Sequence, residues 1–214
     1  MSGYEVLSLD ELDRFPGATG ATQVLLPIRR RLGFRPFGVN AWLGEHAGDH
    51  VIERHREMNG HEELYVVLRG VAAFTLGDEV FDAPVGTLVH ARPGTLRAAT
   101  AAEAGTIVLA VGATPGAAFS PSPWEDFHVA FALLRRGEEG AARALVQEAL
   151  ARDPEAWQGA YNAACFEAIA GRPDDALEWL RIAVERGGPD VKRFADDDRD
   201  FDVIRGDPRY ADLS

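Results

Sequence analysis

The sequence predicts a multi-domain chain in which an all-β domain is followed by an all-α domain. Short runs rich in Val, Leu, Phe and Thr alternate with turn residues in the first half, whereas alanine and leucine recur at helical spacing in the second half. Prolines cluster between Thr114 and Trp124, where they would end both helices and central strands. We therefore expect domains at residues 1–114 and 124–214, joined by a Pro-rich linker at 115–123.

The first domain has the pattern of an antiparallel sandwich or barrel. A short helical turn is expected at 8–15, where Ser8 is a candidate N-cap and Glu11 follows three residues later. Gly77 and Asp78 lie between two apolar runs and predict a tight hairpin. The candidate strands are residues 39–43, 64–68, 72–76, 80–81, 86–90 and 106–111.

The second domain has a helical period that also repeats. Helices are expected at 127–135, 139–151, 158–170 and 174–185. An offset of 34 residues places Gly137 on Gly171 and Ala142 on Ala176, which are small residues that permit turns and close helix packing. This period resembles the tetratricopeptide repeat (TPR), so helical hairpins that present a face to a protein or peptide partner are expected. The tail at 190–214 is expected to supply a capping helix.

Composition excludes several classes of partner. The chain has 34 acidic and 22 basic residues, and this net charge of −12 disfavours binding to nucleic acid or to an anionic membrane. No signal peptide and no apolar stretch of membrane-spanning length is present, so we expect a cytoplasmic protein. The single cysteine, Cys165, excludes an intramolecular disulfide and suits a reducing compartment.

The candidate site lies in the segment HREMNGHEELYVVLRG at residues 55–70. Imidazoles and carboxylates crowd there just before an apolar run, which is the composition of a site in the mouth of a β-barrel. Residues two apart on a strand share a face, so His61, Glu63 and Tyr65 are expected to point together. His55 and Glu57 are expected on the adjoining strand.

This segment resembles the first motif of the cupin family, which forms a small jelly-roll barrel around an interior site. That motif runs His-x-His, three or four residues, Glu, six residues and Gly. Glu63 and Gly70 keep the final spacing, His55 stands for the first His, and Glu57 takes the place of the second His. The resemblance covers about residues 35–112 and implies a jelly-roll fold for the first domain.

A later segment resembles the second cupin motif, which runs Gly, five residues, Pro-x-Gly, two residues and His. Gly86 and Gly94 keep their places, and Arg97 stands where the last metal ligand would be. A guanidinium cannot ligate a cation and would oppose one at close range. Arg97 would therefore either close the barrel through a salt bridge with Glu63 or Glu57, or reach past an ion to an anionic substrate.

Two functional hypotheses remain open from the sequence. In the first, the barrel binds a small molecule and a divalent metal (Fe, Mn, Zn or Ni) held by His55, Glu57, His61 and Glu63. The resemblance then allows dioxygenase, isomerase or lyase chemistry, with Arg97, Tyr65 and His90 contacting substrate. In the second, the barrel is a metal-free, non-catalytic dimerising or ligand-sensing scaffold, and His90 is a strand residue satisfied by hydrogen bonds. A homodimer is expected in either case.

Overall fold

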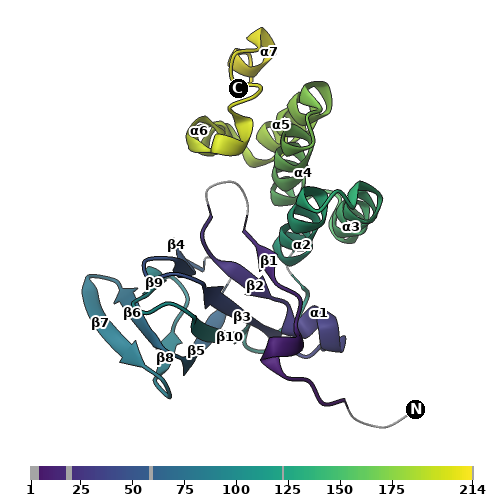
Figure 1. Ribbon diagram of the computed structural model, residues 1–214. Coiled ribbons are helices and arrows are strands. Elements are labelled where there is room, and N and C mark those ends of the chain that lie inside the picture. The colour runs from purple at the N-terminus through teal and green to yellow at the C-terminus, as the bar shows by residue number, and fades with distance from the viewer. Residues whose placement is uncertain (1–4, 18–20, 58–59, 122, 214) are drawn as a thin grey trace. The chain divides into compact units, whose positions relative to one another are not determined.

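The computed structural model describes residues 5–17, 21–57, 60–121 and 123–213. These residues form two compact units, one containing 5–17 and 21–121 and the other containing 123–213. The elements of both units are labelled in Figure 1.

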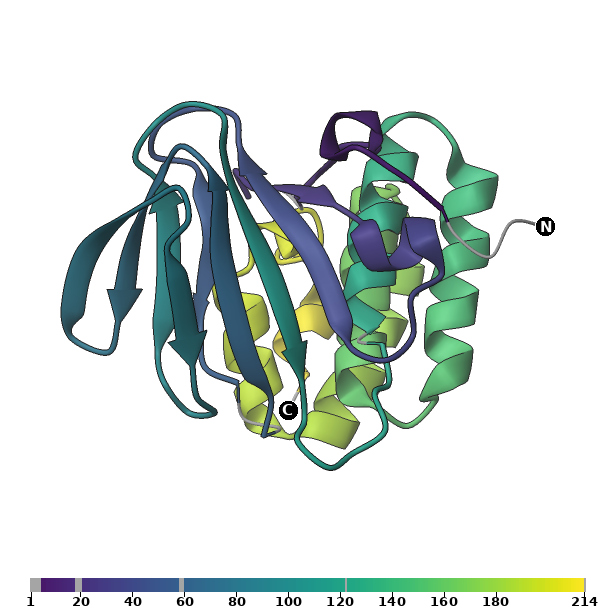
Figure 2. The same cartoon turned by 90° about the horizontal axis from the view of Figure 1, so that it is seen from below.

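The first unit is a sandwich of two antiparallel sheets, whose strands can be followed in Figures 1 and 2. The larger sheet has the order β1-β2-β3-β10-β5-β8 and the smaller has the order β4-β9-β6-β7. The chain crosses between the sheets after most of strands β3 to β10, which is the strand order of a jelly roll. The jelly-roll prediction is therefore confirmed. The elements are η1 (Leu9–Glu11), β1 (Phe15–Pro16), β2 (Val24–Leu26), α1 (Ile28–Leu32), β3 (Gly38–Gly44), β4 (His50–His55), β5 (Glu62–Arg69), β6 (Val71–Leu76), β7 (Glu79–Pro84), β8 (Leu88–Ala91), β9 (Arg97–Ala101) and β10 (Thr106–Ala113).

Local sequence explains several of these elements. Ser8 and Glu11 form a capping box around η1, as expected, with the backbone N–H of Ser8 donating to Glu11 Oε2 at 2.7 Å. Gly77 has a positive φ of 58° in the hairpin between β6 and β7, a conformation that glycine adopts without strain. The candidate strands do not include β1, β2, β4 or β9, although His55 was expected on a strand and ends β4. Strands β4 and β9 pair with each other in the smaller sheet.

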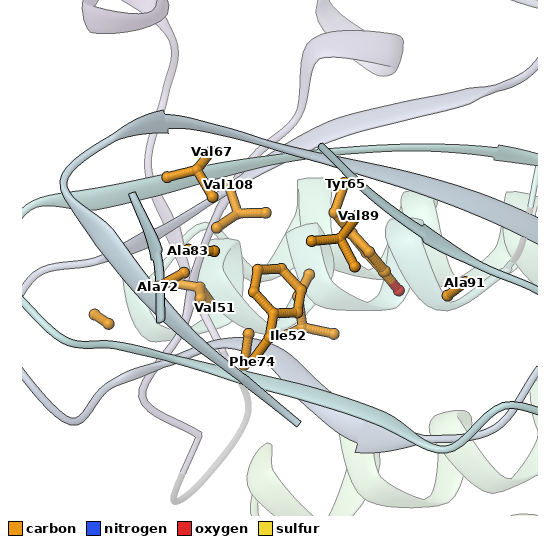
Figure 3. Close-up of a cluster of buried hydrophobic side chains, with 12 residues drawn as sticks. Val51, Ile52, Tyr65, Val67, Ala72, Phe74, Ala83, Val89, Ala91 and Val108 are labelled. Atoms are coloured by element: carbon orange, nitrogen blue, oxygen red, sulfur yellow. The ribbon is translucent and has the colours of Figure 1, made fainter. Parts of the chain in front are cut away.

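The core of the jelly roll lies between its two sheets. Inward-facing side chains from both sheets form one buried cluster, which includes Val51, Phe74 and Val108 (Figure 3). Tyr65 belongs to this cluster, and its hydroxyl oxygen points away from Val67 and Val108 (Figure 3). The core is therefore apolar around Val67 and Val108, and the Tyr65 hydroxyl is a polar group at its other end.

The second unit is helical. Its elements are α2 (Pro123–Arg135), α3 (Glu139–Arg152), α4 (Trp157–Ile169), α5 (Pro173–Gly187), α6 (Pro189–Asp197), η2 (Arg199–Phe201) and α7 (Pro208–Ala211). Helices α2 and α3 pack together, as do α4 and α5 (Figure 1). Gly137 and Gly171 follow α2 and α4 with positive φ values of 80° and 73°, which agrees with the turns expected there. In the part of the chain that the structure describes, no helix is both long and apolar enough to span a membrane.

Candidate functional site

Three strands bring the candidate site together. His55 ends β4 and is the register partner of Arg97, the first residue of β9. Glu63 and Tyr65 lie two apart on β5 in the opposite sheet, so both side chains point to the same side. Glu57 was expected on the same strand as His55 but follows β4, and its carbonyl accepts a hydrogen bond from the backbone N–H of Gly94 at 2.9 Å. These five side chains, of His55, Glu57, Glu63, Tyr65 and Arg97, are called the polar cluster below.

Arg97 is the most deeply buried member of the polar cluster, with 0% of its surface exposed. Its Nη1 donates to the carbonyl of Thr95 at 2.8 Å, and its Nη2 lies 3.1 Å from Glu63 Oε2. Neither Nε nor Nη2 has a hydrogen-bond partner within the described residues, so the contact with Glu63 is an ion pair outside hydrogen-bond geometry. The guanidinium therefore keeps donors available inside the protein.

Glu63 is the member of the polar cluster that contacts Tyr65, His55 and Arg97. Its Oε2 accepts a hydrogen bond from the Tyr65 hydroxyl at 2.5 Å and lies 3.7 Å from His55 Nε2. Burial alone would raise the pKa of Glu63, but His55, the Tyr65 hydroxyl and the charge of Arg97 together lower it below its usual value. Glu63 is therefore a carboxylate at neutral pH.

His55 is a cation in this environment. Its Nδ1 lies 2.8 Å from the carbonyl of Glu53, and its Nε2 lies 3.5 Å from Glu57 Oε1. Burial opposes protonation, but the contacts with Glu57, Glu63 and the Glu53 carbonyl outweigh it and raise the pKa of His55 to about 10. At neutral pH the polar cluster thus holds the protonated imidazole of His55 and the carboxylate of Glu63.

Access to the polar cluster is through His55 and Glu57. Their side chains are 35% and 25% exposed, against 16% for Glu63. Tyr65, at 1% exposed, lies behind Glu63 on the side of the apolar core. Burial and the negative charge of Glu63 raise the pKa of the Tyr65 phenol, which is therefore protonated and donates its hydrogen to Glu63.

The structure does not place His61 and His90 in this arrangement. His61 precedes β5, which begins at Glu62, and its ring stacks on Phe119 with the ring centroids 6.4 Å apart. His90 lies on β8 between the buried Val89 and Ala91, so strand alternation turns its side chain outward, where Nε2 lies 3.8 Å from Glu62 Oε2.

The polar cluster includes a group of candidate metal ligands. Ligand atoms of His55, Glu57 and Glu63 all lie within 4.8 Å of one another. The chemistry around them opposes a cation, because Glu63 Oε2 already contacts Tyr65, His55 and Arg97. A divalent ion would have to displace the His55 proton and lie near a buried, permanently charged guanidinium. The residues present therefore fit a divalent metal poorly.

A second group of candidate ligands lies in the helical unit. Atoms of Cys165, Asp198 and Asp200 lie within 4.8 Å of one another. Asp198 Oδ2 accepts from the Tyr161 hydroxyl at 2.8 Å and lies 3.8 Å from Cys165 Sγ. Burial raises the pKa of the Cys165 thiol well above its usual value, so the sulfur is protonated and is a weak ligand. Sequence analysis did not predict this group, because Asp198 and Asp200 lie in an acidic tail that is distant in sequence from Cys165.

Sequence reasoning also missed the contacts that hold the Glu57 segment. Arg56 Nη1 donates to the carbonyl of Gly94 at 2.6 Å, and the N–H of Gly94 donates back to the Glu57 carbonyl. Gly94 has a positive φ of 77°, so the glycine that matches the second cupin motif was the available signal.

Comparison with known proteins adds the following findings. No family model and no curated protein matches this chain. Among solved structures, a sugar phosphate isomerase from a cupin superfamily of Silicibacter pomeroyi is similar at 20% identity, covering 55% of this chain and 77% of that chain with a TM-score of 0.46. A predicted oxalate decarboxylase from Thermotoga maritima is similar at 16% identity, covering 51% and 99% of the two chains with a TM-score of 0.42. KdgF from Halomonas sp. is similar at 15% identity, covering 53% and 94% with a TM-score of 0.42. Each TM-score is below 0.5, so the assignment of the first unit as a jelly roll rests on its own strand order.

Proposed function

We propose that the jelly-roll unit is a cupin that binds a small polar molecule at the polar cluster, without a resident metal. The observation that carries this proposal is the contact of 3.1 Å between Arg97 Nη2 and Glu63 Oε2, made by a fully buried guanidinium. Arg97 supplies at this place the positive charge that a metal would otherwise supply. Of the two roles that the sequence left open for Arg97, this geometry favours the salt bridge.

The polar cluster offers a ligand both donors and acceptors. The exposed edges of His55 and Glu57 provide a cationic donor and a carboxylate acceptor side by side. Behind them, Arg97 has donors that no described residue satisfies. Because the cluster contains two basic and two acidic residues, their formal charges balance and the ligand need not carry a large charge. We infer a small molecule with hydroxyl or carboxylate groups.

A metal centre formed by His55, Glu57 and Glu63 is the second candidate, favoured by the 4.8 Å grouping of their ligand atoms. One imidazole and two carboxylates would suit Fe, Mn or Zn, with positions left open for a ligand. Elemental analysis of protein purified without chelator separates the two candidates. We expect less than about 0.1 metal ion per chain. Stoichiometric metal that disappears in a His55→Ala, Glu63→Ala double variant would overturn the metal-free proposal and support the metal centre.

Ligand binding itself is tested by thermal unfolding of the whole chain in a panel of succinate, gluconate and glucose. A compound that binds the folded state raises its Tm. We expect at least one of these compounds to stabilise the native protein but not the Glu57→Gln variant. Glu79→Gln, on β7, is the matched control and should respond as the native protein does. A panel without any effect would contradict binding of this class of molecule.

For the helical unit, we propose a TPR-like array that binds a peptide segment of a partner protein. Helices α2 and α4 begin at Pro123 and Trp157, and α3 and α5 begin at Glu139 and Pro173, so both starts recur after 34 residues. Selection of a random displayed peptide library against the whole chain tests this proposal. Enriched peptides that shift backbone NMR signals of the helical unit would support it, whereas no enrichment, or shifts confined to the jelly roll, would contradict it.

The homodimer expected from the sequence stays a prediction, which light scattering of the whole chain tests. A mass near 46 kDa, twice the 23.2 kDa of one chain, is the expected result, and a mass of one chain would contradict it.

A further inference from the structure

A groove lies beside α5 in the helical unit. It has a volume of about 390 Å³ and is lined by residues of α5 and of the segment that includes α7. This volume is within the range of sites that take a small ligand or one to two side chains of a peptide.

The floor of the groove is apolar. Leu177 and Val184 lie seven residues apart on α5, which places them on one face of the helix, and both are buried. Leu213, beyond α7, is half-buried and adds a third aliphatic side chain. An aliphatic side chain of a partner could therefore pack against all three.

The rim of the groove is charged and predominantly acidic. Its carboxylates are those of Asp174, Glu178, Glu185 and Asp212, and its cations are Arg181 and Arg209. Each arginine is already paired with two carboxylates. Arg181 Nη2 lies 2.7 Å from Glu178 Oε1 and Nη1 pairs with Glu185, while Arg209 Nη2 lies 2.7 Å from Asp174 Oδ1 and 2.8 Å from Asp207 Oδ2.

Asp212 gives the rim an uncompensated negative charge. It is exposed and forms no ion pair with any other residue in the described ranges. The surroundings reinforce this charge, because residues 122–214 contain 20 acidic and 12 basic residues. The groove thus combines an aliphatic floor with a negative potential.

We propose that this groove binds a basic segment of a partner protein, through an aliphatic side chain flanked by lysine or arginine. The inference rests on the proposed peptide-binding function of the helical unit and adds a location and a chemistry. Charge complementarity selects this occupant, because basic side chains would be attracted to the predominantly acidic rim and to the uncompensated charge of Asp212. Anionic surfaces are disfavoured for the same reason.

The probe for the test is a short fluorescein-labelled peptide with a central leucine flanked on each side by a pair of lysines. Its binding to the whole chain is followed by fluorescence anisotropy at about 0.1 M salt, where weak long-range attraction is screened. We expect the peptide to bind and to shift the methyl NMR signals of Leu177, Val184 and Leu213. A peptide with serine in place of leucine should bind at least about fivefold more weakly, because it lacks the aliphatic anchor.

Two variants alter the groove and one is a matched control. Asp212→Lys reverses the uncompensated charge and should weaken binding at least about fivefold. Leu213→Trp fills the groove and should weaken it by a similar factor. Glu148→Lys makes the same charge change at an exposed position of α3 and should leave affinity within about twofold. Asp212→Asn removes the charge without reversing it and keeps the size of the side chain. It should also weaken binding, which would show that the loss of affinity in Asp212→Lys does not reflect unfolding.

Equal weakening by Asp212→Lys and Glu148→Lys would overturn the inference, since it would show non-specific attraction to an acidic protein. Peptide-induced shifts that avoid Leu177, Val184 and Leu213 would overturn it as well. If peptides from the display selection bind the helical unit elsewhere, the groove is wrong while the peptide-binding function stands. If no peptide binds the unit at all, both fail.

Discussion

Arg97 Nη2 lies 3.1 Å from Glu63 Oε2, and this ion pair joins the two sheets of the jelly roll inside the protein. The Arg97 side chain is 0% exposed and the Glu63 side chain is 16% exposed. A buried ion pair of this kind adds little stability compared with apolar residues at the same two positions. Loss of one partner, however, weakens the compensation of the other charge inside the protein, which is strongly destabilising.

The first prediction concerns removal of one partner. Arg97→Met should lower the free energy of unfolding of the jelly-roll unit by about 3 kcal/mol, because the buried Glu63 loses the nearer of its two cations and keeps only His55. Adding Glu63→Gln to this variant should restore more than about 1 kcal/mol, since the amide can still accept from Tyr65 without a charge. Urea unfolding followed through NMR signals of the jelly-roll unit measures both. Arg69→Met, which removes an exposed ion pair to Asp10, is the control and should cost less than about 1 kcal/mol.

The second prediction concerns the pH dependence of His55. Because its pKa in the folded protein is about 10, against 6.5 for an ordinary histidine, the imidazole should stay protonated through neutral pH. Its contribution to stability is fully present below pH 6.5 and is lost as pH rises through about 10. Nitrogen NMR shifts of the ring, assigned with a His55→Gln variant, follow this titration directly. A ring that loses its proton near pH 6.5 would show that the contacts with Glu57 and Glu63 are absent in solution.

The third prediction concerns the hydrogen bond from Tyr65 to Glu63. Tyr65→Phe removes one of the groups that lower the pKa of Glu63, so that pKa should rise. Carbon NMR titration of the Glu63 carboxyl group measures the change. Tyr161→Phe deletes a comparable hydrogen bond to Asp198 in the helical unit and should leave Glu63 unaffected. An unchanged titration of Glu63 in Tyr65→Phe would contradict the assigned geometry.

The fourth prediction concerns helix packing in the second unit. A Cβ at Gly187 would clash with Val191 Cγ2 and would lie 2.7 Å from Trp157 Cγ, so Gly187→Ala should destabilise this unit by about 1–3 kcal/mol. Gly140, in the first turn of α3, has no heavy atom within 4 Å of such a Cβ. Gly140→Ala should therefore not destabilise the unit and should stabilise it by up to about 0.5 kcal/mol. Thermal unfolding measured by circular dichroism at 222 nm compares the two variants, and a destabilising effect of similar size in both would count against the packing described here.

The helices and the apolar strands were predictable because their signal is local. The helical period of alanine and leucine predicted α2 to α5, and the glycines at 137 and 171 predicted the turns between them. Strand β9 was missed because its sequence, RAATA, has a charged residue and small residues where a strand usually has β-branched ones. Its strand conformation comes from pairing with β4 and β6 on both sides, which local sequence does not encode.

The candidate site was predictable in composition but not in contact. Strand alternation correctly placed Glu63 and Tyr65 on one face, because both lie within β5. The same argument extended to His61, but β5 begins after it and its ring stacks on Phe119, a residue distant in sequence. The choice between the two roles of Arg97 depended on the register that pairs it with His55 and on its full burial, and both are tertiary properties.

The central claim is that Arg97 takes the place of a metal in the polar cluster, and zinc titration of the native protein and the Arg97→His variant by calorimetry tests it most directly. The account predicts no stoichiometric binding to the native cluster and binding at least about tenfold tighter in Arg97→His, because the imidazole adds a ligand and removes the opposing charge. Tight stoichiometric zinc binding by the native protein that is lost in the His55→Ala, Glu63→Ala variant would contradict it.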